Sequence, residues 1–324
     1  MANKVQTIGV LTSGGDAPGM NAAIRAVVRT ALAAGMKVKG IKHGYAGLLE
    51  EDIVDMDTRS VADILQRGGT ILYTARCLEF KELEVQKKGA EILRKHGIDG
   101  LVVIGGDGSF MGASKLAALG INTVGIPGTI DLDIACTEYT IGFDTAVNTA
   151  MDAIDKVRDT STSHERCSII EVMGRNAGYI ALWCGVANGA EDILLPERWK
   201  GEEDKLIAHI KETQAKGKKH HIVINAEGIG NSQALAKKIE KETGMETRAT
   251  ILGHLQRGGS PTCKDRVYAS LMGAYAVDLL AKGESNRVVA YANGEYVDYE
   301  IDEALAMKKD IDDYQYDVSK HLAR

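Results

Sequence analysis

The chain has 324 residues, of which 44% are hydrophobic and 26% are charged, and its formal net charge is −6 at pH 7. This composition is typical of a globular protein with one large or two medium domains, and no apolar run reaches the roughly 18 residues that span a bilayer. The negative charge, the lack of a basic stripe and five scattered cysteines predict a cytoplasmic protein that binds neither nucleic acid nor membrane.

Short apolar runs alternate with amphipathic stretches along most of the chain. The pattern predicts strands at 6–11, 37–41, 99–104, 122–126, 167–173, 192–195, 221–226 and 286–291. It predicts helices at 18–34, 84–96, 143–159, 201–215, 231–242 and 265–282, and a short strand, a helix and a tail in 292–324. Such alternation indicates mostly parallel sheets covered by helices on both faces. We therefore expect an α/β protein with two doubly wound, three-layer domains that face each other across a cleft.

Ligands of open parallel sheets bind beyond the carboxyl ends of the strands. Five predicted strands are followed by segments rich in glycine or charge: TSGGDAPGMN (12–21), GGDGS (105–109), PGTIDLD (127–133), MGRNAG (173–178) and EGIGN (227–231). A purely structural protein has little reason to place such segments at all of these strand ends. The pattern therefore predicts a ligand-binding protein.

The segment GGDGS favours a phosphate site that contains a metal ion. Gly105, Gly106 and Gly108 allow backbone N–H groups to approach a phosphate at a helix N-terminus. Asp107 is then explained as a ligand of Mg²⁺, which carboxylates and phosphates hold together at nucleotide sites. The alternative is an aspartate that caps a helix in an ordinary turn. A second strand–glycine turn, SGGD at 13–16, favours the phosphate site.

The segment PGTIDLD holds two carboxylates, Asp131 and Asp133, that point to the same side if the chain is extended there. One of such a pair can act as a base toward a substrate hydroxyl group. The alternative is a solvated acidic loop.

Basic residues also flank the strands and glycine turns, and arginine's planar guanidinium suits bidentate recognition of phosphate. Individually each would more often be a surface residue than a ligand. The candidates are Arg166, Arg175, Arg248, His254 and Arg257.

Taken together, the segments TSGGDAPGMNAAIR, IGGDGS, PGTIDxD, SHxR, VMGR and GHxQRGGSP resemble the bacterial ATP-dependent 6-phosphofructokinases (type A) over essentially the whole chain. GGDG also occurs in NAD kinases and diacylglycerol kinases, but those families lack the MGR and HxQRGG segments. The resemblance implies transfer of a phosphoryl group from MgATP to the 1-hydroxyl of fructose 6-phosphate, the committed step of glycolysis. It implies Mg²⁺ as the cofactor.

Roles follow from the resemblance by motif position, with Asp131 as the catalytic base and Asp107 on the metal. ATP contacts are implied at Gly15, Arg76, Cys77, Gly106, Asp107, Gly108 and Ser109. Sugar-phosphate contacts are implied at Thr129, Ile130, Asp131, Arg166, Met173, Gly174, Arg175, Glu227, Arg248, His254, Leu255, Gln256 and Arg257. A larger ATP-binding domain is expected at 1–139 plus 252–308, and a smaller sugar-phosphate-binding domain at 140–251 plus 309–324.

The resemblance also implies allosteric regulation. Arg25 and Arg29 share one helix face, and two solvated arginines are the alternative there. The implied site for ADP or phosphoenolpyruvate consists of Arg25, Arg29, Arg158, Gly189, Glu191, Lys216, Lys218, Lys219 and His220. A homotetramer is implied, in which Arg166 and Arg248 enter the active site of the neighbouring subunit.

The chain departs from the family pattern at two positions. Leu132 stands where the family usually has asparagine, and Arg59 is displaced by one position from the family's effector arginine. The alternative functions are a pyrophosphate-dependent relative and a non-catalytic nucleotide sensor, and only Leu132 supports the sensor. Gly108 and Gly128 favour ATP, because pyrophosphate-dependent relatives tend to carry aspartate and lysine there. The intact Asp107 and Asp131 argue against the sensor.

Overall fold

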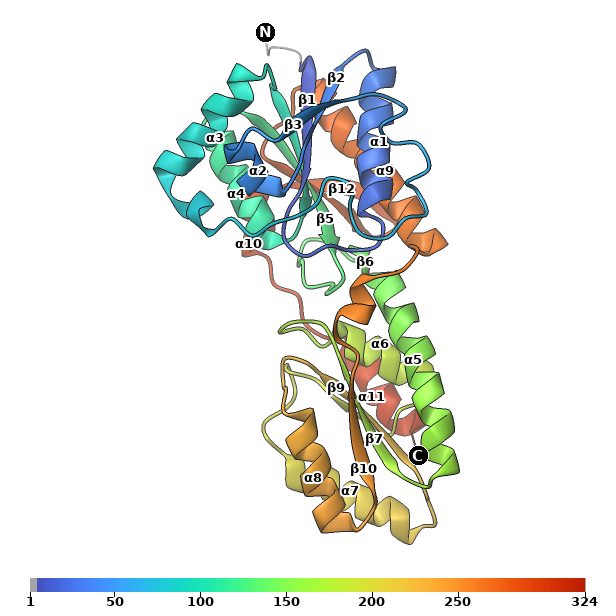
Figure 1. Ribbon diagram of the computed structural model, residues 1–324. Helices are drawn as coiled ribbons and strands as arrows, with labels where there is room; N and C mark the ends of the chain where they lie inside the picture. Colours follow the sequence, from blue (N-terminus) through green and yellow to red (C-terminus); the bar gives the residue numbers. More distant parts are fainter. Residues whose placement is uncertain (1–4, 324) are drawn as a thin grey trace. The chain divides into compact units, whose positions relative to one another are not determined.

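A computed structural model of the chain describes residues 5–323, which form two compact units. The first consists of the described residues up to Ile130, with Ile134–Thr145 and Arg257–Lys309. The second consists of Asp131–Asp133, Ala146–Gln256 and the described residues from Asp310 onward. Each unit has its own mostly parallel sheet with helices packed against it (Figure 1), which confirms the predicted α/β fold class.

The sheet of the first unit is formed by strands from both ends of the chain. Its strands are β1 (Thr7–Thr12), β2 (Lys37–Ile41), β3 (Ile53–Met56), β4 (Gly100–Gly105), β5 (Asn122–Thr129), β6 (Ile141–Gly142), β11 (Arg287–Ala292) and β12 (Glu295–Glu300). The order is β12-β11-β5-β4-β1-β2-β3, with β6 beside β5. Neighbours are parallel except β2 with β3 and β11 with β12. Every residue of β1 and β4 is buried, as expected for central strands that are covered on both faces.

Helices cover both faces of this sheet (Figure 1). The helical elements are α1 (Met20–Ala33), α2 (Gly44–Leu49), η1 (Leu78–Lys81), α3 (Leu83–Lys95), α4 (Asp107–Ala118), α9 (Cys263–Lys282) and α10 (Ile301–Ala306). On one face α1 packs against α9, and on the other α2 and α4 pack against α3. Tyr45, Phe80 and Phe110 form part of the core under α2, α3 and α4, where the rings of Tyr45 and Phe80 stack at 4.3 Å.

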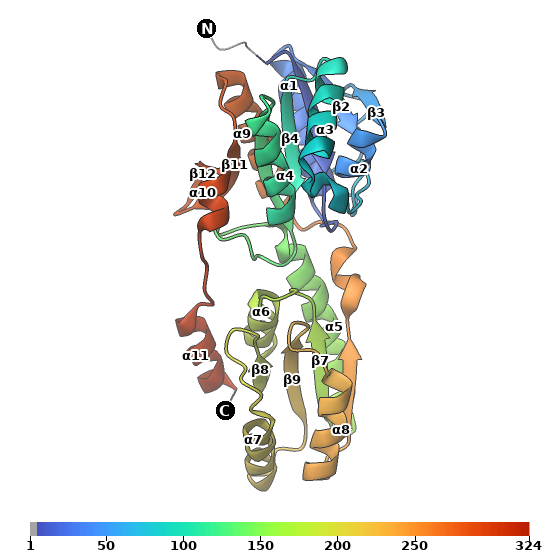
Figure 2. The same cartoon turned by 90° about the vertical axis from the view of Figure 1, so that its left-hand side faces the viewer.

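The second unit has a smaller sheet whose strands are all parallel. They are β7 (Cys167–Val172), β8 (Asp192–Leu194), β9 (His221–Ala226) and β10 (Thr247–Ile251), in the order β10-β7-β9-β8. On one face, α7 (Glu203–Ala215) and α8 (Ser232–Thr243) pack through Leu206, Ile210 and Ile239. On the other face lie α5 (Phe143–Ser163), α6 (Tyr179–Asn188) and α11 (Asp313–Leu322) (Figure 2).

Hydrogen bonds explain where the two units divide. The sequence places 140–145 and Lys309 in the smaller domain and 131–133 and 252–256 in the larger one, whereas the structure groups all four the other way. Thr145 donates its N–H to Asp265 of the first unit, at 2.8 Å. Leu252 donates its N–H to the carbonyl of Glu171 in the second unit, at 3.0 Å. These bonds carry no signal in the local sequence, because each joins segments at least 80 residues apart.

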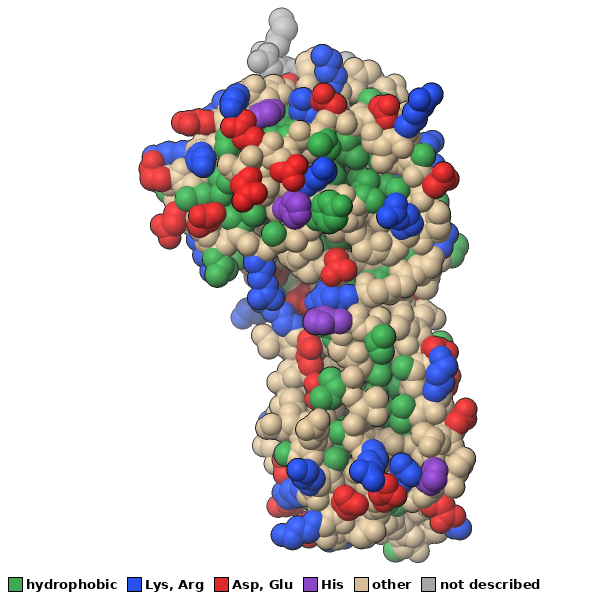
Figure 3. Space-filling view, in the orientation of Figure 1, with side chains coloured by type: hydrophobic (Ala, Val, Ile, Leu, Met, Phe, Trp, Pro, Cys, Tyr) green, Lys and Arg blue, Asp and Glu red, His purple; other side chains and the backbone are tan. Residues whose placement is uncertain are grey.

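Charges of both signs lie side by side on the surface of the second unit. Near its lower end in Figure 3, over α7 and α8, Lys and Arg side chains are interspersed with Asp and Glu. Lys238 pairs there with Glu203 at 2.7 Å, and solvent screens such an exposed pair strongly. Within the described part of the chain, none of the helices combines the length and apolarity that spanning a bilayer requires.

A buried carboxylate fixes the segment that leads from β5 into α5. Asp265, in the first turn of α9, accepts hydrogen bonds from the hydroxyl of Tyr139 (2.6 Å), the N–H of Gly142 (2.7 Å), and the N–H and hydroxyl of Thr145. Burial raises the pKa of Asp265, while these donors act in the opposite direction. One side chain therefore joins three points of the chain to the start of α9.

Replacing Asp265 by asparagine should lower the free energy of unfolding by about 1–3 kcal/mol, because an amide NH₂ would face donors that the carboxylate satisfies. Urea unfolding measures the loss. Asp278→Asn, on the exposed side of the same helix, is the matched control and should change stability by less than about 0.5 kcal/mol. Equal stability of the two variants would contradict the assigned role of Asp265.

Candidate active site

Two glycine-rich loops meet at the carboxyl ends of the neighbouring strands β1 and β4. The N–H of Ser13 donates to the carbonyl of Ile104 at 2.9 Å and so adds one hydrogen bond beyond the paired strands. A Cβ on Gly105 would lie 2.5 Å from the carbonyl oxygen of Ser13. Gly105 is therefore required for the close approach of the two loops.

The second loop leads directly into α4. Gly106 is the N-cap, and its carbonyl oxygen accepts hydrogen bonds from the N–H groups of Ser109 and Phe110. Asp107 is the first residue of the helix. A Cβ on Gly106 or Gly108 would meet nothing within 4 Å, so these glycines leave space open rather than relieve a clash. The exposed carboxylate of Asp107 beside open helical N–H groups fits a phosphate chain that carries a divalent cation. Ser109 is buried, so it offers this site little side-chain surface.

Arg257 lies against the first loop. Its Nη1 donates to the carbonyl of Asp16 at 2.9 Å, and a Cβ on Gly15 would lie only 2.6 Å from the same Nη1. Gly15 therefore makes room for a guanidinium group. The structure places Arg257, which the sequence groups with the sugar-phosphate residues, beside Gly15, which the sequence groups with the nucleotide residues.

The segment that carries Arg76 and Cys77 is anchored to the same loop. The hydroxyl of Thr74 donates to the carbonyl of Gly14 at 2.7 Å. Asn21 of α1 forms hydrogen bonds with the backbone of residues 67, 68 and 71, which precede this segment. Arg76 is exposed, and partial burial raises the pKa of the Cys77 thiol. Asn21 and Thr74 are not among the predicted site residues, although Asn21 lies within the first glycine-rich motif.

Asp131 follows β5, which is the parallel neighbour of β4. Its side chain is only 6% exposed, and that of Ile130 is fully buried, so Ile130 can offer only its backbone to a ligand. Thr129 is the last residue of the strand and is half-buried. The backbone at Leu132 has a φ of 56°, in the left-handed region that leucine rarely adopts and asparagine tolerates better. The segment is therefore not extended at Leu132. The prediction that Asp131 and Asp133 point to the same side required an extended chain, so the structure does not support it.

A second pair of loops follows β7 and β9 in the other unit. The N–H of Glu227 donates to the carbonyl of Val172 at 2.9 Å. Its Oε1 accepts the N–H groups of Gly174 (3.2 Å) and Arg175 (2.5 Å), both of which have a positive φ. Glu227 therefore holds the backbone of the MGR turn, and the side chain of Arg175 is left exposed.

Gln256 supports the same turn from a buried position. Its Oε1 accepts the N–H of Met173 at 2.8 Å, and its side chain is fully buried. Leu255 is 68% exposed and His254 is also exposed, so these two residues of η2 (Gly253–Arg257) are accessible where Gln256 is not. The structure therefore makes Gln256 a positioning residue rather than one that contacts a ligand through its side chain.

Arg166 and Arg248 lie at the other end of this sheet. Arg166 directly precedes β7, and Arg248 pairs in register with Ser168 at the start of that strand. Their guanidinium groups share Glu246, at 3.7 and 2.8 Å. The MGR turn follows the far end of the six-residue β7, about 20 Å away at the usual rise per residue. Within one chain the structure does not bring these two arginines together with Arg175.

The predicted effector residues fall into separate groups. Arg158 donates to the carbonyls of Asn188 and Gly189, and the buried Glu191 accepts from Lys218 (2.5 Å) and from the N–H of Ile222 (2.6 Å). The remaining effector residues make other contacts. Lys216 pairs with Glu212, Lys219 pairs with Glu165, His220 is half-buried, and Arg25 and Arg29 lie on α1 of the first unit.

Known proteins that are similar to this chain over most of its length include phosphofructokinases from bacteria and yeast. The phosphofructokinase family model matches residues 7–280. The ATP-dependent 6-phosphofructokinase of Clostridium botulinum is 61% identical over 320 residues, which cover 99% of this chain and all of that relative. The structure of phosphofructokinase from Saccharomyces cerevisiae has a TM-score of 0.85 at 33% identity over 98% of this chain, which spans 46% of the yeast chain. A pyrophosphate-dependent phosphofructokinase from Marinobacter aquaeolei shares the fold, with a TM-score of 0.85 at 22% identity, covering 96% of this chain and 86% of that one.

The role of Glu227 can be tested at the MGR turn itself. In Glu227→Ala the N–H groups of residues 174 and 175 lose their acceptor, at a cost of about 1–3 kcal/mol. Their hydrogen exchange should therefore accelerate by about five- to a hundredfold, whereas Glu227→Gln keeps a carbonyl oxygen and should change it much less. Exchange is measured by NMR or mass spectrometry. Unchanged exchange in Glu227→Ala would show that the MGR turn keeps its conformation without Glu227.

Proposed function

This chain belongs to the phosphofructokinase family, and we propose that it transfers the terminal phosphoryl group of ATP to the 1-hydroxyl of fructose 6-phosphate. The products are fructose 1,6-bisphosphate and ADP. The observation that carries the proposal is the paired glycine loops after β1 and β4, with Asp107 at the start of α4 and Asp131 after the adjacent β5. Both substrates are cytoplasmic metabolites, so the cytoplasm is the proposed location.

The first unit supplies the nucleotide site in this proposal. The loops at Gly15 and at Gly106–Ser109, with Arg76 and Cys77 beside them, take the phosphates and the nucleoside of ATP. Mg²⁺ held by Asp107 would neutralise the charge that develops on the phosphates. Gly106 and Gly108 contribute open space and backbone N–H groups, which need no reorganisation when the nucleotide binds.

Asp131 is the proposed base for the proton of the sugar hydroxyl. As the oxygen of the 1-hydroxyl bonds to the phosphorus, its proton passes to the carboxylate of Asp131, and the bond to the leaving ADP oxygen breaks. Asp131 is buried and follows β5 closely, so the end of this strand fixes the position of its carboxylate. Phosphoryl transfer depends mainly on positioning, so a base contributes one part of the rate.

The second unit supplies sugar-phosphate contacts from the MGR turn, which Glu227 and Gln256 hold in shape. Arg166 and Arg248 lie at the opposite end of β7, so we propose that they act in the site of a neighbouring copy of the chain. That arrangement requires an oligomer, for which a homotetramer is proposed. The contacts of Arg158, Gly189, Glu191 and Lys218 support an effector site for ADP or phosphoenolpyruvate, with Arg25 and Arg29 among its further members.

The donor is tested by a coupled assay of fructose 6-phosphate phosphorylation with ATP and with pyrophosphate. We expect ATP to support the faster turnover, because position 108 carries no side chain to crowd an α-phosphate. Gly108→Asp would place a carboxylate in that space and should raise the KM for ATP. Faster turnover of the wild-type protein with pyrophosphate would overturn the proposed donor.

Removing the proposed base should slow the reaction without abolishing substrate binding. Asp131→Ser should lower kcat by at least about 100-fold, the low end for general acid–base catalysis, with a modest change in the KM for the sugar phosphate. Asp55→Ser, at an exposed position on β3, is the control and should keep wild-type kcat. A kcat within a few-fold of wild type for Asp131→Ser would remove this residue from the mechanism.

Sharing of active sites between copies can be tested by complementation. An inactive Asp131→Ser chain and an inactive Arg166→Ser chain are mixed, unfolded and refolded together. Sites built from two chains should recover activity, because some hybrid interfaces combine an intact Asp131 with an intact Arg166. Refolded oligomers without recovered activity, beside a wild-type control that refolds well, would show that each site is built within one chain.

A further inference from the structure

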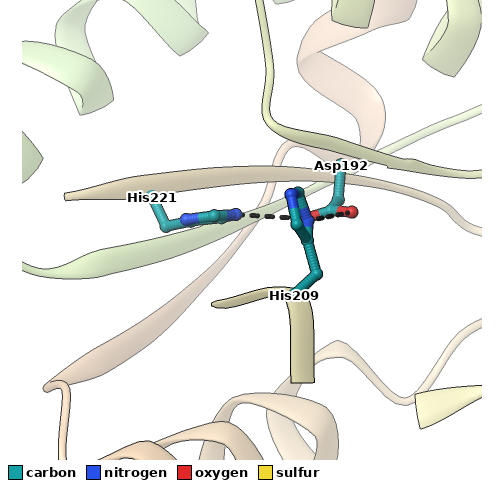
Figure 4. A group of neighbouring side chains, drawn as sticks. All are labelled: Asp192, His209 and His221. Carbon is teal, nitrogen blue, oxygen red and sulfur yellow. Dashed lines mark hydrogen bonds and ion pairs between the residues drawn. The ribbon is translucent and has the colours of Figure 1, made fainter. Parts of the chain in front are cut away.

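Three potential metal ligands converge in the second unit, apart from the residues of the MGR turn. Asp192 comes from β8, His209 from α7 and His221 from β9 (Figure 4). Nδ1 of His209 lies 3.0 Å from Oδ2 of Asp192, and Nε2 of His221 lies 3.0 Å from the same oxygen. One ligand atom from each residue lies within 4.8 Å of the other two, so a single ion can reach all three after small movements.

The three positions are held by regular secondary structure rather than by loops. β8 and β9 are parallel neighbours, and α7 packs on the same sheet through Leu206 and Ile210. The side chain of His221 is 1% exposed, whereas that of His209 is 37% exposed. Among the described residues Nδ1 of His221 has no hydrogen-bond partner, whereas its Nε2 contacts the carboxylate of Asp192. An ion bound at Nε2 would replace that contact, and the ring proton would then lie on Nδ1.

The cluster also has access to water. A cavity of about 260 Å³ is lined by Asp192 and His209 together with Tyr316, Ser319 and Lys320 of α11. It can supply the water molecules that complete a coordination shell with three protein ligands. Lys320, the nearest lysine on α11, pairs with Asp317 at 3.0 Å, and its Nζ lies 3.9 Å from the ring centroid of Tyr316. These two contacts partly compensate the positive charge of Lys320 beside the cavity.

We propose that Asp192, His209 and His221 bind a divalent transition-metal ion, for which Zn²⁺ is the best match. Two imidazole nitrogens and one carboxylate oxygen suit Zn²⁺, whereas Mg²⁺ prefers an all-oxygen shell. The ion would replace the two hydrogen bonds to Asp192 and join β8, α7 and β9 at one point. The site is distinct from the proposed Mg²⁺ site at Asp107 and does not depend on the proposed reaction.

The contacts of Glu191 link the proposed metal site to the neighbouring ends of β8 and β9. Glu191, next to Asp192, accepts the N–H of Ile222, which in turn follows His221. Glu191 also pairs with Lys218, so bound metal would stiffen the strand ends that carry this ion pair. We expect Zn²⁺ to raise the thermal midpoint of the full chain until the site is saturated, because a ligand of the folded state stabilises that state.

Equilibrium dialysis of the full-length, chelator-treated protein against Zn²⁺ tests the site. We expect one equivalent per chain, no competition from millimolar Mg²⁺, and at least about tenfold weaker binding in His209→Gln. His96→Gln is the matched control, because His96 is a half-buried histidine that bonds a single carboxylate, Glu51, at 2.7 Å. It should bind Zn²⁺ as the wild type does.

A crystal soaked in Zn²⁺ gives an independent readout, with an anomalous peak expected between Asp192, His209 and His221. The proposal is overturned if the wild-type chain shows no saturable binding. It is equally overturned if His209→Gln binds one equivalent unchanged, since the ion then lies elsewhere, for example at the exposed Cys263. His209→Gln should keep the circular dichroism of the wild type, because its side chain is only partly buried.

Discussion

The register of β4 on β1 is the constraint on which the nucleotide site depends. Thr12 pairs with Ile104 at the ends of these strands, and the next hydrogen bond, from Ser13 to Ile104, sets the starting point of both glycine-rich loops. A slip of one residue would turn every side chain of a strand to the other face. Both strands are wholly buried, so a slipped register would have to repack the side chains on both faces of the sheet, and the observed pairing sets the alignment of the two loops.

In the second unit, too, a hydrogen bond beyond the paired strands joins the ends of β7 and β9. Glu227 donates its N–H to Val172, as Ser13 does to Ile104, and its side chain then folds back to hold the MGR turn. A parallel sheet therefore presents two distinct ends. Residues that follow the strands meet at one end. Arg166 precedes β7, so it lies at the other end, where it pairs with Glu246.

Much of this arrangement could be predicted from the sequence. Each predicted strand is present, because buried parallel strands read as short apolar runs. The sequence pattern does not predict β3, β6 or β10, since β3 and β10 are only partly buried, β10 contains the charged Arg248, and β6 has only two residues. Of the helices, the pattern does not predict α2, α4 or α6, and α4 is hidden because it begins inside the glycine motif, at Asp107. Strand ends located the loops, but long-range contacts such as Asp265 to Gly142 or Arg257 to Gly15 leave no mark in a local pattern.

The contact between Gly15 and Arg257 has an evolutionary consequence. A side chain at position 15 and a guanidinium from position 257 would occupy the same volume, although 241 residues separate Arg257 from its acceptor at Asp16. A side chain at position 15 would therefore move the guanidinium away from the carbonyl of Asp16, through another rotamer of Arg257 or through a change of residue 257. Substitutions at these two positions are therefore expected to have coupled effects, because both side chains draw on the same space.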